Sequence, residues 1–252
     1  MPLLEVNNLS VAFGGIKPVS NFNLEIDNHE LVGLIGPNGA GKTTIFNLLT
    51  GVYMPTKGGI TIEGESIVGK KPYQIVERGI TRTFQNIRLF KSMAVIDNVK
   101  MACHHNMTYT PLEGILRTKR FKAEEAAVEA QAYELLEIFG MEDLAYEKSD
   151  NLSYGQQRKL EVARALAGKP KLLLLDEPAA GMNPNETLEL METIKMIRDQ
   201  LDTSILLIEH DMSLVMGICE RIVVIDYGQV IAMGTPKEIQ SNEKVIGAYL
   251  GA

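Results

Sequence analysis

The sequence has little cysteine, no excess of basic residues and no long apolar run, and each shortage excludes a class of protein. Its two cysteines, Cys103 and Cys219, are too few and too far apart for a disulfide framework or a thiolate metal site. They fit a reducing cytoplasm. Lys and Arg number 25 against 32 Asp and Glu, which gives a net charge of −7. That balance argues against a protein that coats nucleic acid, because such proteins are usually basic.

The apolar runs are too short for a membrane span, which needs roughly 20 mostly apolar residues in succession. The longest candidates are residues 172–175 and 206–208. The N-terminal sequence MPLLEVNNLS lacks the basic stretch followed by an apolar stretch that marks a signal peptide. We therefore expect a protein that stays in the cytosol and contacts a membrane only through partners.

Length and hydrophobic patterning predict an α/β domain with an inserted helical segment. With 252 residues, the chain can bury a large core without disulfides or metals. Alternating apolar residues predict strands between positions 3 and 35, and no strand-like run occurs between Gln85 and Lys169. Helices are expected at 43–49, 123–139 and 185–200, strands at 58–64, 171–176, 204–209, 222–225 and 230–232, and an irregular segment at 104–122.

A glycine-rich segment between a predicted strand and a predicted helix carries the strongest motif. It reads Gly36-Pro37-Asn38-Gly39-Ala40-Gly41-Lys42-Thr43 and matches the phosphate-binding loop, G-x-x-x-x-G-K-[ST]. Glycines let successive backbone N–H groups point at one anion, and the following helix adds its positive end. Lys42 can reach the β- and γ-phosphates, and the Thr43 hydroxyl can bind Mg²⁺. An ordinary glycine-rich turn would not need this place between strand and helix.

Two acids end the apolar run Leu172-Leu173-Leu174-Leu175. Asp176 at the end of a buried strand is where nucleoside triphosphatases hold Mg²⁺, usually through water. Glu177 next to it can orient or deprotonate an attacking water. Two acids after a strand are more often simply solvated, but the upstream phosphate loop favours the catalytic interpretation.

A second phosphate-binding position is predicted at Leu152-Ser153-Tyr154-Gly155-Gln156, ahead of a helix. Ser153 and Gln156 fit the capping box S-x-x-Q, so the simplest interpretation is a helix start. A helix start with serine and glycine can also bind phosphate. In a dimeric ATPase this position and the phosphate loop can meet across the interface.

With these motifs the sequence resembles the nucleotide-binding subunit of ABC transporters over essentially its whole length. The family's motifs occur in the family's order: the phosphate loop at 36–43, the Q-loop Gln85, the signature at 152–156, the Walker B strand at 172–176 with Glu177, the D-loop at 180–183 and the switch His210. The resemblance implies an α/β fold with a P-loop NTPase core of ABC ATPase type, an N-terminal antiparallel β-subdomain and an inserted α-helical subdomain. A single ABC ATPase domain would span 1–252, with the core at 1–84 and 169–252 and the helical subdomain at 85–168.

The resemblance also implies a role for each motif residue. ATP would contact Phe13, Gly36, Pro37, Asn38, Gly39, Ala40, Gly41, Lys42, Thr43 and Thr44, and the ATP of the partner subunit would contact Ser153, Gly155 and Gln156. Mg²⁺ would contact Thr43, Gln85 and Asp176, and catalysis would use Glu177, His210, Lys42 and Gln85. Phe13 would stack on adenine, although it could instead be a core aromatic. His29, His104 and His105 fit no motif.

Two residues depart from the family pattern and three motifs narrow the subgroup. Tyr154 replaces the first glycine of the usual LSGGQ, and Asn183 stands where the D-loop usually has aspartate. Lys42 and Glu177 remain, so an active site is expected. The sequences LSYGQ, AGMNP and RTFQNIRLF resemble the LivG-type subunit of branched-chain amino-acid importers. The basic insert at 104–122 also resembles that subgroup, although a solvated face would account for most of its charges.

The resemblance implies that two such subunits, identical or related, sandwich two ATP molecules with Mg²⁺. Binding would close the pair and hydrolysis would reopen it. The segment near Gln85 would pass the motion to two transmembrane permease subunits, and a periplasmic or lipid-anchored binding protein would supply cargo. No nucleic-acid partner is expected. The protein would lie on the cytoplasmic face of the cell membrane.

Three other functions share parts of this pattern. A urea importer or a lipopolysaccharide exporter would use the same nucleotide chemistry and differ only in subgroup motifs. A soluble ABC ATPase of DNA repair or translation would have coiled-coil arms or tandem cassettes, whereas this chain has one phosphate loop and no heptad arms. A regulatory module without turnover would typically lack Glu177 or His210.

Overall fold

The computed structural model describes residues 1–103 and 107–250, which fall into two compact units. Unit 1 comprises residues 1–85 and 171–252, and unit 2 comprises residues 86–170. His104 and His105, at the start of the expected irregular segment, lie outside the described residues. No helix within the described ranges is long and apolar enough to cross a membrane.

The first sheet of unit 1 is antiparallel and has the strand order β2-β1-β4-β5. Its strands are β1 (Leu4–Phe13), β2 (Ile16–Ile26), β4 (Lys57–Ile62) and β5 (Glu65–Ser66). The alternation in the sequence has the predicted effect, because Leu4, Val6, Leu9 and Val11 of β1 are buried while Glu5 and Asn7 between them are not. The sheet therefore has one apolar face, which it turns toward the core of the unit.

The second sheet of unit 1 has the strand order β10-β9-β3-β8-β7-β6 and is parallel apart from the β9–β10 hairpin. Its strands are β3 (Leu31–Ile35), β6 (Ile80–Arg82), β7 (Leu172–Asp176), β8 (Ser204–Ile208), β9 (Arg221–Asp226) and β10 (Gln229–Gly234). Every residue of β3, β7 and β8 is buried. Short, continuously apolar strands of this kind are typical of a parallel sheet covered on both faces.

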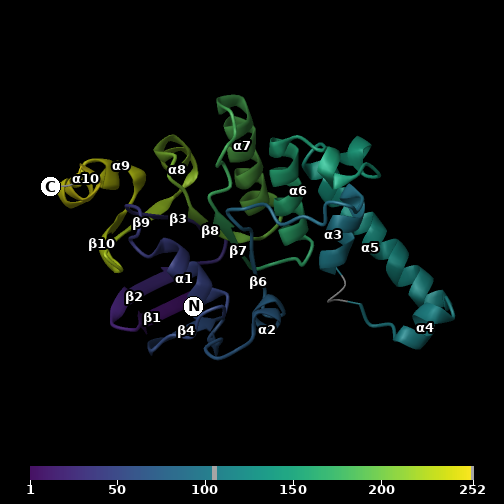
Figure 1. Ribbon diagram of the computed structural model, residues 1–252, viewed down its shortest axis with the longest axis horizontal. Coiled ribbons are helices and arrows are strands. Elements are labelled where there is room, and N and C mark those ends of the chain that lie inside the picture. The colour runs from purple at the N-terminus through teal and green to yellow at the C-terminus, as the bar shows by residue number, and fades with distance from the viewer. Residues whose placement is uncertain (104–106, 251–252) are drawn as a thin grey trace. The chain divides into compact units, whose positions relative to one another are not determined.

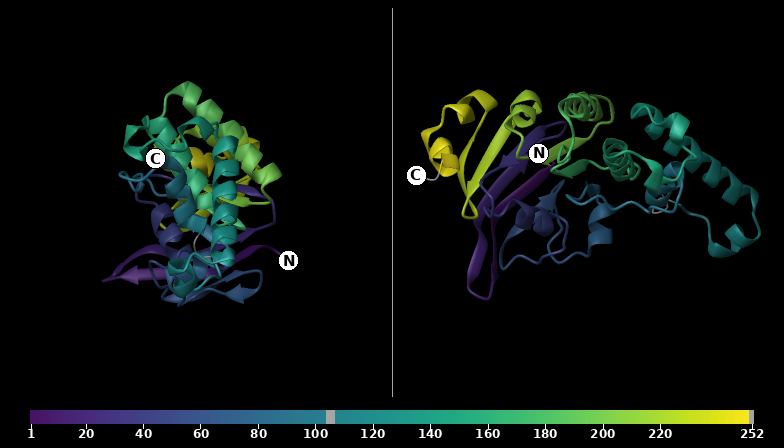
Figure 2. Two further views of the ribbon diagram at one scale, coloured as in Figure 1. Left: turned by 90° about the vertical axis from the view of Figure 1, so that its right-hand side faces the viewer. Right: turned by 45° about the horizontal axis from the view of Figure 1, so that its top comes forward.

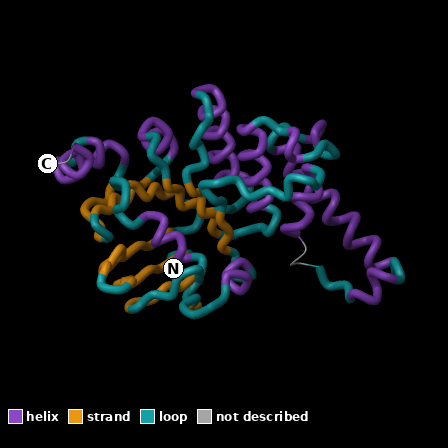
Figure 3. The backbone as a smooth tube through the Cα atoms, viewed as in Figure 1, coloured by secondary structure: helices purple, strands orange, loops and turns teal. Residues whose placement is uncertain are grey.

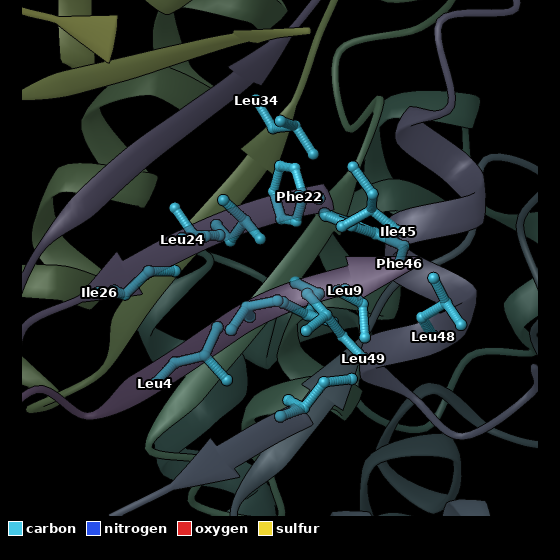
Figure 4. Close-up of a cluster of buried hydrophobic side chains, with 14 of the residues drawn as sticks. Leu4, Leu9, Phe22, Leu24, Ile26, Leu34, Ile45, Phe46, Leu48 and Leu49 are labelled. Carbon is cyan, nitrogen blue, oxygen red and sulfur yellow. The ribbon is translucent and has the colours of Figure 1, made fainter. Parts of the chain in front are cut away.

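Helices cover both faces of the six-stranded sheet. Figures 1 and 2 show α7 (Pro184–Gln200) and α8 (Met212–Ile218) on one face and α1 (Lys42–Leu49) on the other. Unit 1 also contains the short helices α2 (Pro72–Val76), α9 (Pro236–Gln240) and α10 (Glu243–Leu250). Figure 4 shows part of an apolar cluster that contains Ile45 and Phe46 of α1 together with Phe22 and Leu24 of β2. Burial of α1 between the two sheets fixes the start of this helix, which the phosphate loop precedes.

In the described part of unit 2 the regular elements are all helices, and Figure 3 draws no strand colour there. It contains α3 (Val95–Cys103), α4 (Pro111–Ile115), α5 (Lys119–Ile138), two short 3₁₀ turns, η2 (Glu142–Leu144) and η3 (Ser149–Asn151), and α6 (Tyr154–Leu166). Buried apolar residues of α3, α5 and α6, among them Val99, Leu136 and Leu160, form its core.

The structure confirms the α/β fold and corrects one local prediction. Residues 104–122 were expected to be irregular, but their described part contains α4 and the first turn of α5, which begins at Lys119 rather than at 123. Threonine caps explain the difference. The Thr110 side chain accepts a bond from the Glu113 N–H, and the Thr118 side chain accepts one from the Phe121 N–H. Helix α3 was not predicted.

Candidate nucleotide-binding site

Glycines hold the loop between β3 and α1 against two neighbouring strands. A side chain at Gly36 would lie 2.1 Å from the carbonyl oxygen of Ile225, and one at Gly41 would lie 2.4 Å from that of Pro18. The φ angles of these glycines are 157° and 108°. Such close approach, with that backbone conformation, requires glycine. The packing of the sheet thus dictates the path of the predicted phosphate loop.

Lys42, the first residue of α1, is buried at the base of the loop. Its Nζ donates hydrogen bonds to the carbonyl oxygens of Gly36, at 2.6 Å, and Pro37, at 3.0 Å. Burial lowers the pKa of Lys42, and the negative charges of Glu177 and Asp176 act in the opposite direction. The lysine is therefore held inside its own loop, with two carboxylates nearby.

A pocket of about 290 Å³ opens beside the loop. Its lining consists of Pro18, Asn38, Gly39, Ala40, Gly41, Lys42, Thr43, Thr44, Gln85, Glu177 and His210. Five separate stretches of sequence line this space, and they include the two threonine hydroxyls, one lysine and one carboxylate. A larger pocket of about 450 Å³, lined in part by Glu63, Lys70 and Lys171, contains none of the predicted site residues.

Asp176 ends β7 and forms a buried ion pair with Arg82 of β6. Nη2 of Arg82 lies 2.6 Å from Oδ2 of Asp176, and both side chains are less than a tenth exposed. Nη1 of Arg82 donates to Oδ1 of Asn47 in α1, at 2.7 Å. The guanidinium also lies over the rings of Phe46 and Phe84, 5.4 and 5.2 Å from their centres. These contacts fix the orientation of the Asp176 carboxylate.

Glu177 joins two other predicted residues through its carboxylate. Nε2 of His210 lies 2.8 Å from Oε1, and Nε2 of Gln85 donates to Oε2 at 2.7 Å. The φ of Glu177 is +49°, in the left-handed region that non-glycine residues rarely adopt. Such conformations concentrate at functional sites. Three residues from distant parts of the sequence are therefore hydrogen-bonded together at the pocket.

Glu209 was not predicted, yet it holds two strand ends of the site. It is 3% exposed. Its Oε1 accepts a bond from the Ala179 N–H at 2.7 Å, and its Oε2 accepts bonds from the N–H groups of His210 and Asp211, at 2.9 and 3.3 Å. Burial raises the pKa of Glu209, and these N–H groups counteract the rise. Glu209 thereby fixes the backbone that carries His210.

Phe13 lies at the end of β1 with 46% of its surface exposed, so it is not a core aromatic. Its ring contacts the Tyr53 ring edge-on, with centroids 5.0 Å apart. Phe13 is not among the residues that line the 290 Å³ pocket. An exposed aromatic face is free to stack on a ligand ring.

The signature residues belong to unit 2, where Ser153 caps α6. Its Oγ accepts a bond from the Gln156 N–H at 3.3 Å, and Oε1 of Gln156 accepts one from the Ser153 N–H at 2.9 Å. Gly155 lies in the first turn and is buried. Tyr154 accepts a bond from Arg158 at 3.3 Å, and the guanidinium lies 5.7 Å from its ring centre. The helix start is intact with tyrosine in place of glycine.

Asn183, the other departure, caps α7. Its Oδ1 accepts bonds from the N–H groups of Asn185 and Glu186, at 3.0 and 3.1 Å. Asparagine is among the best N-cap residues, so the change from aspartate preserves the start of the helix.

The structure thus brings together the phosphate loop, Gln85, Glu177 and His210, with Asp176 beside them. Sequence reasoning missed Arg82 and Glu209. Arg82 is the last residue of β6 and Glu209 directly follows β8, and charge at such positions is rarely buried without a partner. The position of these charged residues at strand ends was the sequence feature that could have indicated buried, paired side chains.

Comparisons with known proteins identify the family of the chain. The family model described as "ABC transporter" matches residues 19–180, and the model "Branched-chain amino acid ATP-binding cassette transporter" matches residues 229–252. The chain is 49% identical over 250 residues to the high-affinity branched-chain amino acid transport ATP-binding protein LivG of Salmonella typhimurium, covering 99% of this chain and 98% of that one. It is 33% identical over 251 residues to the lipopolysaccharide export system ATP-binding protein LptB of Haemophilus influenzae, covering 100% and 98%.

A solved structure has the same fold along the whole chain. It is the ADP conformation of MJ1267, an ATP-binding cassette of an ABC transporter, with a TM-score of 0.86, 30% identity and 100% of both chains covered. The family model spans more than half of this chain, and the LivG relative covers nearly all of it. The chain therefore belongs to the ABC transporter family, as an ATP-binding cassette.

Proposed function

We propose that this chain binds and hydrolyses ATP to power an ABC importer of branched-chain amino acids. The observation that carries the proposal is the convergence of Lys42, Gln85, Glu177 and His210 on one pocket beside the phosphate loop. In this proposal the loop and the N-terminal end of α1 hold the phosphates, because both present N–H groups to an anion. Lys42 exchanges its bonds to the loop carbonyls for bonds to the β- and γ-phosphates.

The residues present fit Mg²⁺ bound together with nucleotide. Within the described residues no cluster of three His, Cys, Asp or Glu could hold a metal alone. Mg²⁺ usually takes only one or two protein carboxylates and completes its shell with phosphates and water. Thr43, Gln85 and Asp176 are the proposed ligands, directly or through water, and the ion pair with Arg82 uses Oδ2 of Asp176. Bound Mg²⁺ would neutralise charge on the β- and γ-phosphates.

Glu177 is the proposed general base. A carboxylate at the edge of the pocket can accept a proton from the water that attacks the γ-phosphorus. His210, already bonded to Glu177, would hold the carboxylate and contact the γ-phosphate. Gln85 would report the state of the nucleotide, since its amide contacts the same carboxylate. Most of the rate enhancement would come from positioning and charge stabilisation.

The remaining roles concern partners. Ser153, Gly155 and Gln156 are proposed to contact the ATP bound by a second ABC ATPase subunit, identical or related. Two permease subunits and a binding protein would complete the importer, with this chain on the cytoplasmic face of the membrane. The two units would act as the nucleotide-binding core and the helical subdomain.

Branched-chain amino acids are the proposed cargo because the LivG relative is named for their transport and shares 49% of aligned residues with this chain. Lipopolysaccharide is disfavoured, since the relative named for its export is only 33% identical. The match of the branched-chain cassette model to residues 229–252 gives separate support.

Two substitutions test the ATPase. Lys42→Ala should abolish tight ATP binding, because it removes the fixed cation of the phosphate site. Glu177→Gln should retain ATP binding and lose about 10²–10⁴-fold in hydrolysis, because an amide cannot accept the proton. Calorimetry and phosphate release measure the two effects. Wild-type turnover in Glu177→Gln would exclude Glu177 as the base.

Cargo is tested on the reconstituted complex with its binding protein. Leucine should accelerate ATP hydrolysis by the complex and leave the isolated chain unchanged, since no pocket of this chain is proposed for cargo. Stimulation by urea but not by leucine, isoleucine or valine would discard the cargo and keep the ATPase.

A further inference from the structure

Unit 2 has an exposed helical tip that the proposed nucleotide chemistry does not use. We define the tip as residues 107–122, which contain α4 and the first turn of α5. Within unit 2 the tip lies at the end of α5 away from α6, as Figure 1 and the right panel of Figure 2 show.

Three large aliphatic side chains of the tip face solvent on one side of α4. Leu112, Ile115 and Leu116 are 64%, 79% and 66% exposed. Their i, i+3, i+4 spacing places them together on the helix surface. The tip does not need them for its own packing, because the rings of Tyr109 and Phe121 make its internal contact, with centroids 5.0 Å apart. Adjacent exposed aliphatic residues in a water-soluble protein commonly mark an interaction site.

Polar contacts hold the tip in shape, so the aliphatic side chains are presented on a defined scaffold. Glu124 accepts bonds from the Thr108 N–H, at 2.8 Å, and from Nε of Arg120, at 3.1 Å. Arg120 also donates to the carbonyl oxygen of Thr108 at 3.1 Å, and the Tyr109 hydroxyl donates to Glu125 at 2.8 Å.

The tip is basic although the chain as a whole is acidic. It has four basic residues and one acid, Glu113, in a chain with net charge −7. Arg120 is committed to Glu124, but Arg117, Lys119 and Lys122 are exposed and form no ion pair within the described ranges. Three exposed cations without an ion pair in those ranges therefore follow the aliphatic side chains closely in the sequence.

We propose that the tip docks on an anionic lipid surface. Leu112, Ile115 and Leu116 enter the headgroup layer, and Arg117, Lys119 and Lys122 face the lipid phosphates. Apolar burial and attraction to anionic lipid act together in such surfaces. An acidic protein groove is the competing occupant. Lipid is favoured because the three cations pair with no acid in the described ranges, and the diffuse charge of a leaflet suits cations without a fixed partner. The proposal does not depend on the nucleotide site.

A single tryptophan tests the contact directly, because the natural chain contains none. In Leu116→Trp, the fluorescence should shift to the blue when phosphatidylcholine vesicles containing phosphatidylglycerol are added, and binding should be at least tenfold weaker to phosphatidylcholine alone. Leu188→Trp, at an exposed leucine of α7, is the matched control and should not shift. No shift at position 116 with anionic vesicles overturns the proposal.

Substitutions at exposed positions then divide the affinity into its parts. Each basic residue near an anionic leaflet is worth about fivefold in affinity, so the triple change Arg117→Gln, Lys119→Gln and Lys122→Gln should weaken vesicle binding by about 100-fold. The pair Leu112→Ser and Ile115→Ser should weaken it by at least about tenfold. Lys237→Gln with Lys244→Gln, exposed in unit 1, is the charge control and should change nothing.

ATP hydrolysis by each variant serves as the check on folding and should stay at the wild-type rate. Absence of hydrolysis in the wild-type protein as well would count against the proposed ATPase without touching the lipid contact. Undiminished vesicle binding by both tip variants overturns the proposal. If those variants instead lose association with the permease subunits, the tip contacts protein and not lipid.

Discussion

Arg82 illustrates how a single side chain connects separate parts of the candidate site. Its guanidinium contacts Asp176 at the end of β7 and Asn47 in α1, and it lies between two aromatic rings. Asp176 is nearly inaccessible to solvent, and Arg82 forms its ion pair. Removing one member of a buried ion pair leaves the other charge uncompensated. Loss of Arg82 would therefore be costly mainly because it leaves Asp176 buried without its ion-pair partner.

Arg82→Ala should lower the free energy of unfolding by about 3–5 kcal/mol, because Asp176 would remain buried without its partner. Chemical denaturation measures this loss. Arg78→Ala is the control, since Arg78 pairs with Glu65 at a more exposed position. An exposed pair contributes about 0–1 kcal/mol. Equal losses in the two variants would show that the buried Arg82–Asp176 pair contributes no more to stability than the more exposed Arg78–Glu65 pair.

The elements show which parts of the structure the sequence encodes locally. Strands β1, β3, β7 and β8 were predicted because alternation or continuous apolarity is a short-range pattern. The start of α5 was predicted too late, because its residues 119–122 are mostly charged and only the Thr118 cap marks the true beginning.

The candidate site shows the same limit. Its motif residues could be predicted because each lies in a short segment whose spacing the chemistry requires. Arg82 and Glu209 could not be assigned roles, because each bonds to a partner far along the chain, Asp176 at 94 positions from Arg82 and Ala179 at 30 positions from Glu209. Sheet pairing brings these partners together, and no short sequence pattern indicates which strands pair.

At the scale of elements, Glu124 joins the tip to α5 and makes the joint sensitive to acid. Hydrogen bonds from Thr108, chiefly from its backbone N–H, lower the pKa of Glu124 from 4.5 to about 2. A lowered folded pKa means that the stabilisation is complete above about 4.5 and is lost as the pH falls toward 2.

Hydrogen exchange of the Thr108 and Tyr109 amides should therefore accelerate between pH 4.5 and 2, after correction for the intrinsic rate. In Glu124→Gln, exchange should be fast at every pH, and the acid-dependent step should vanish. Persistence of that step in the variant would assign it to another carboxylate.

At the scale of the whole molecule, the proposed functions are divided between the two units. The ATP bound by this chain is proposed to lie in unit 1, whereas the signature, which is proposed to contact the ATP of a second subunit, and the basic tip belong to unit 2. Because each unit has its own apolar core, the two can differ in stability. A ligand bound in unit 1 need not stabilise unit 2 equally.

The two cysteines allow the opening rates of unit 1 and unit 2 to be measured separately. Cys103 lies in unit 2 and Cys219 in unit 1, both are buried, and the chain has no others. Burial raises the pKa of both thiols, that of Cys219 to about 12. Since the thiolate is the reactive form, an alkylating reagent should modify each only when its own unit opens. In Glu177→Gln, ATP at 100 times its Kd should slow the labelling of Cys219 by up to about 100-fold. Cys103 should slow less, and equal slowing would mean that the units open together. Mass spectrometry of the two cysteine peptides would then give the opening rate of each unit without any introduced cysteine.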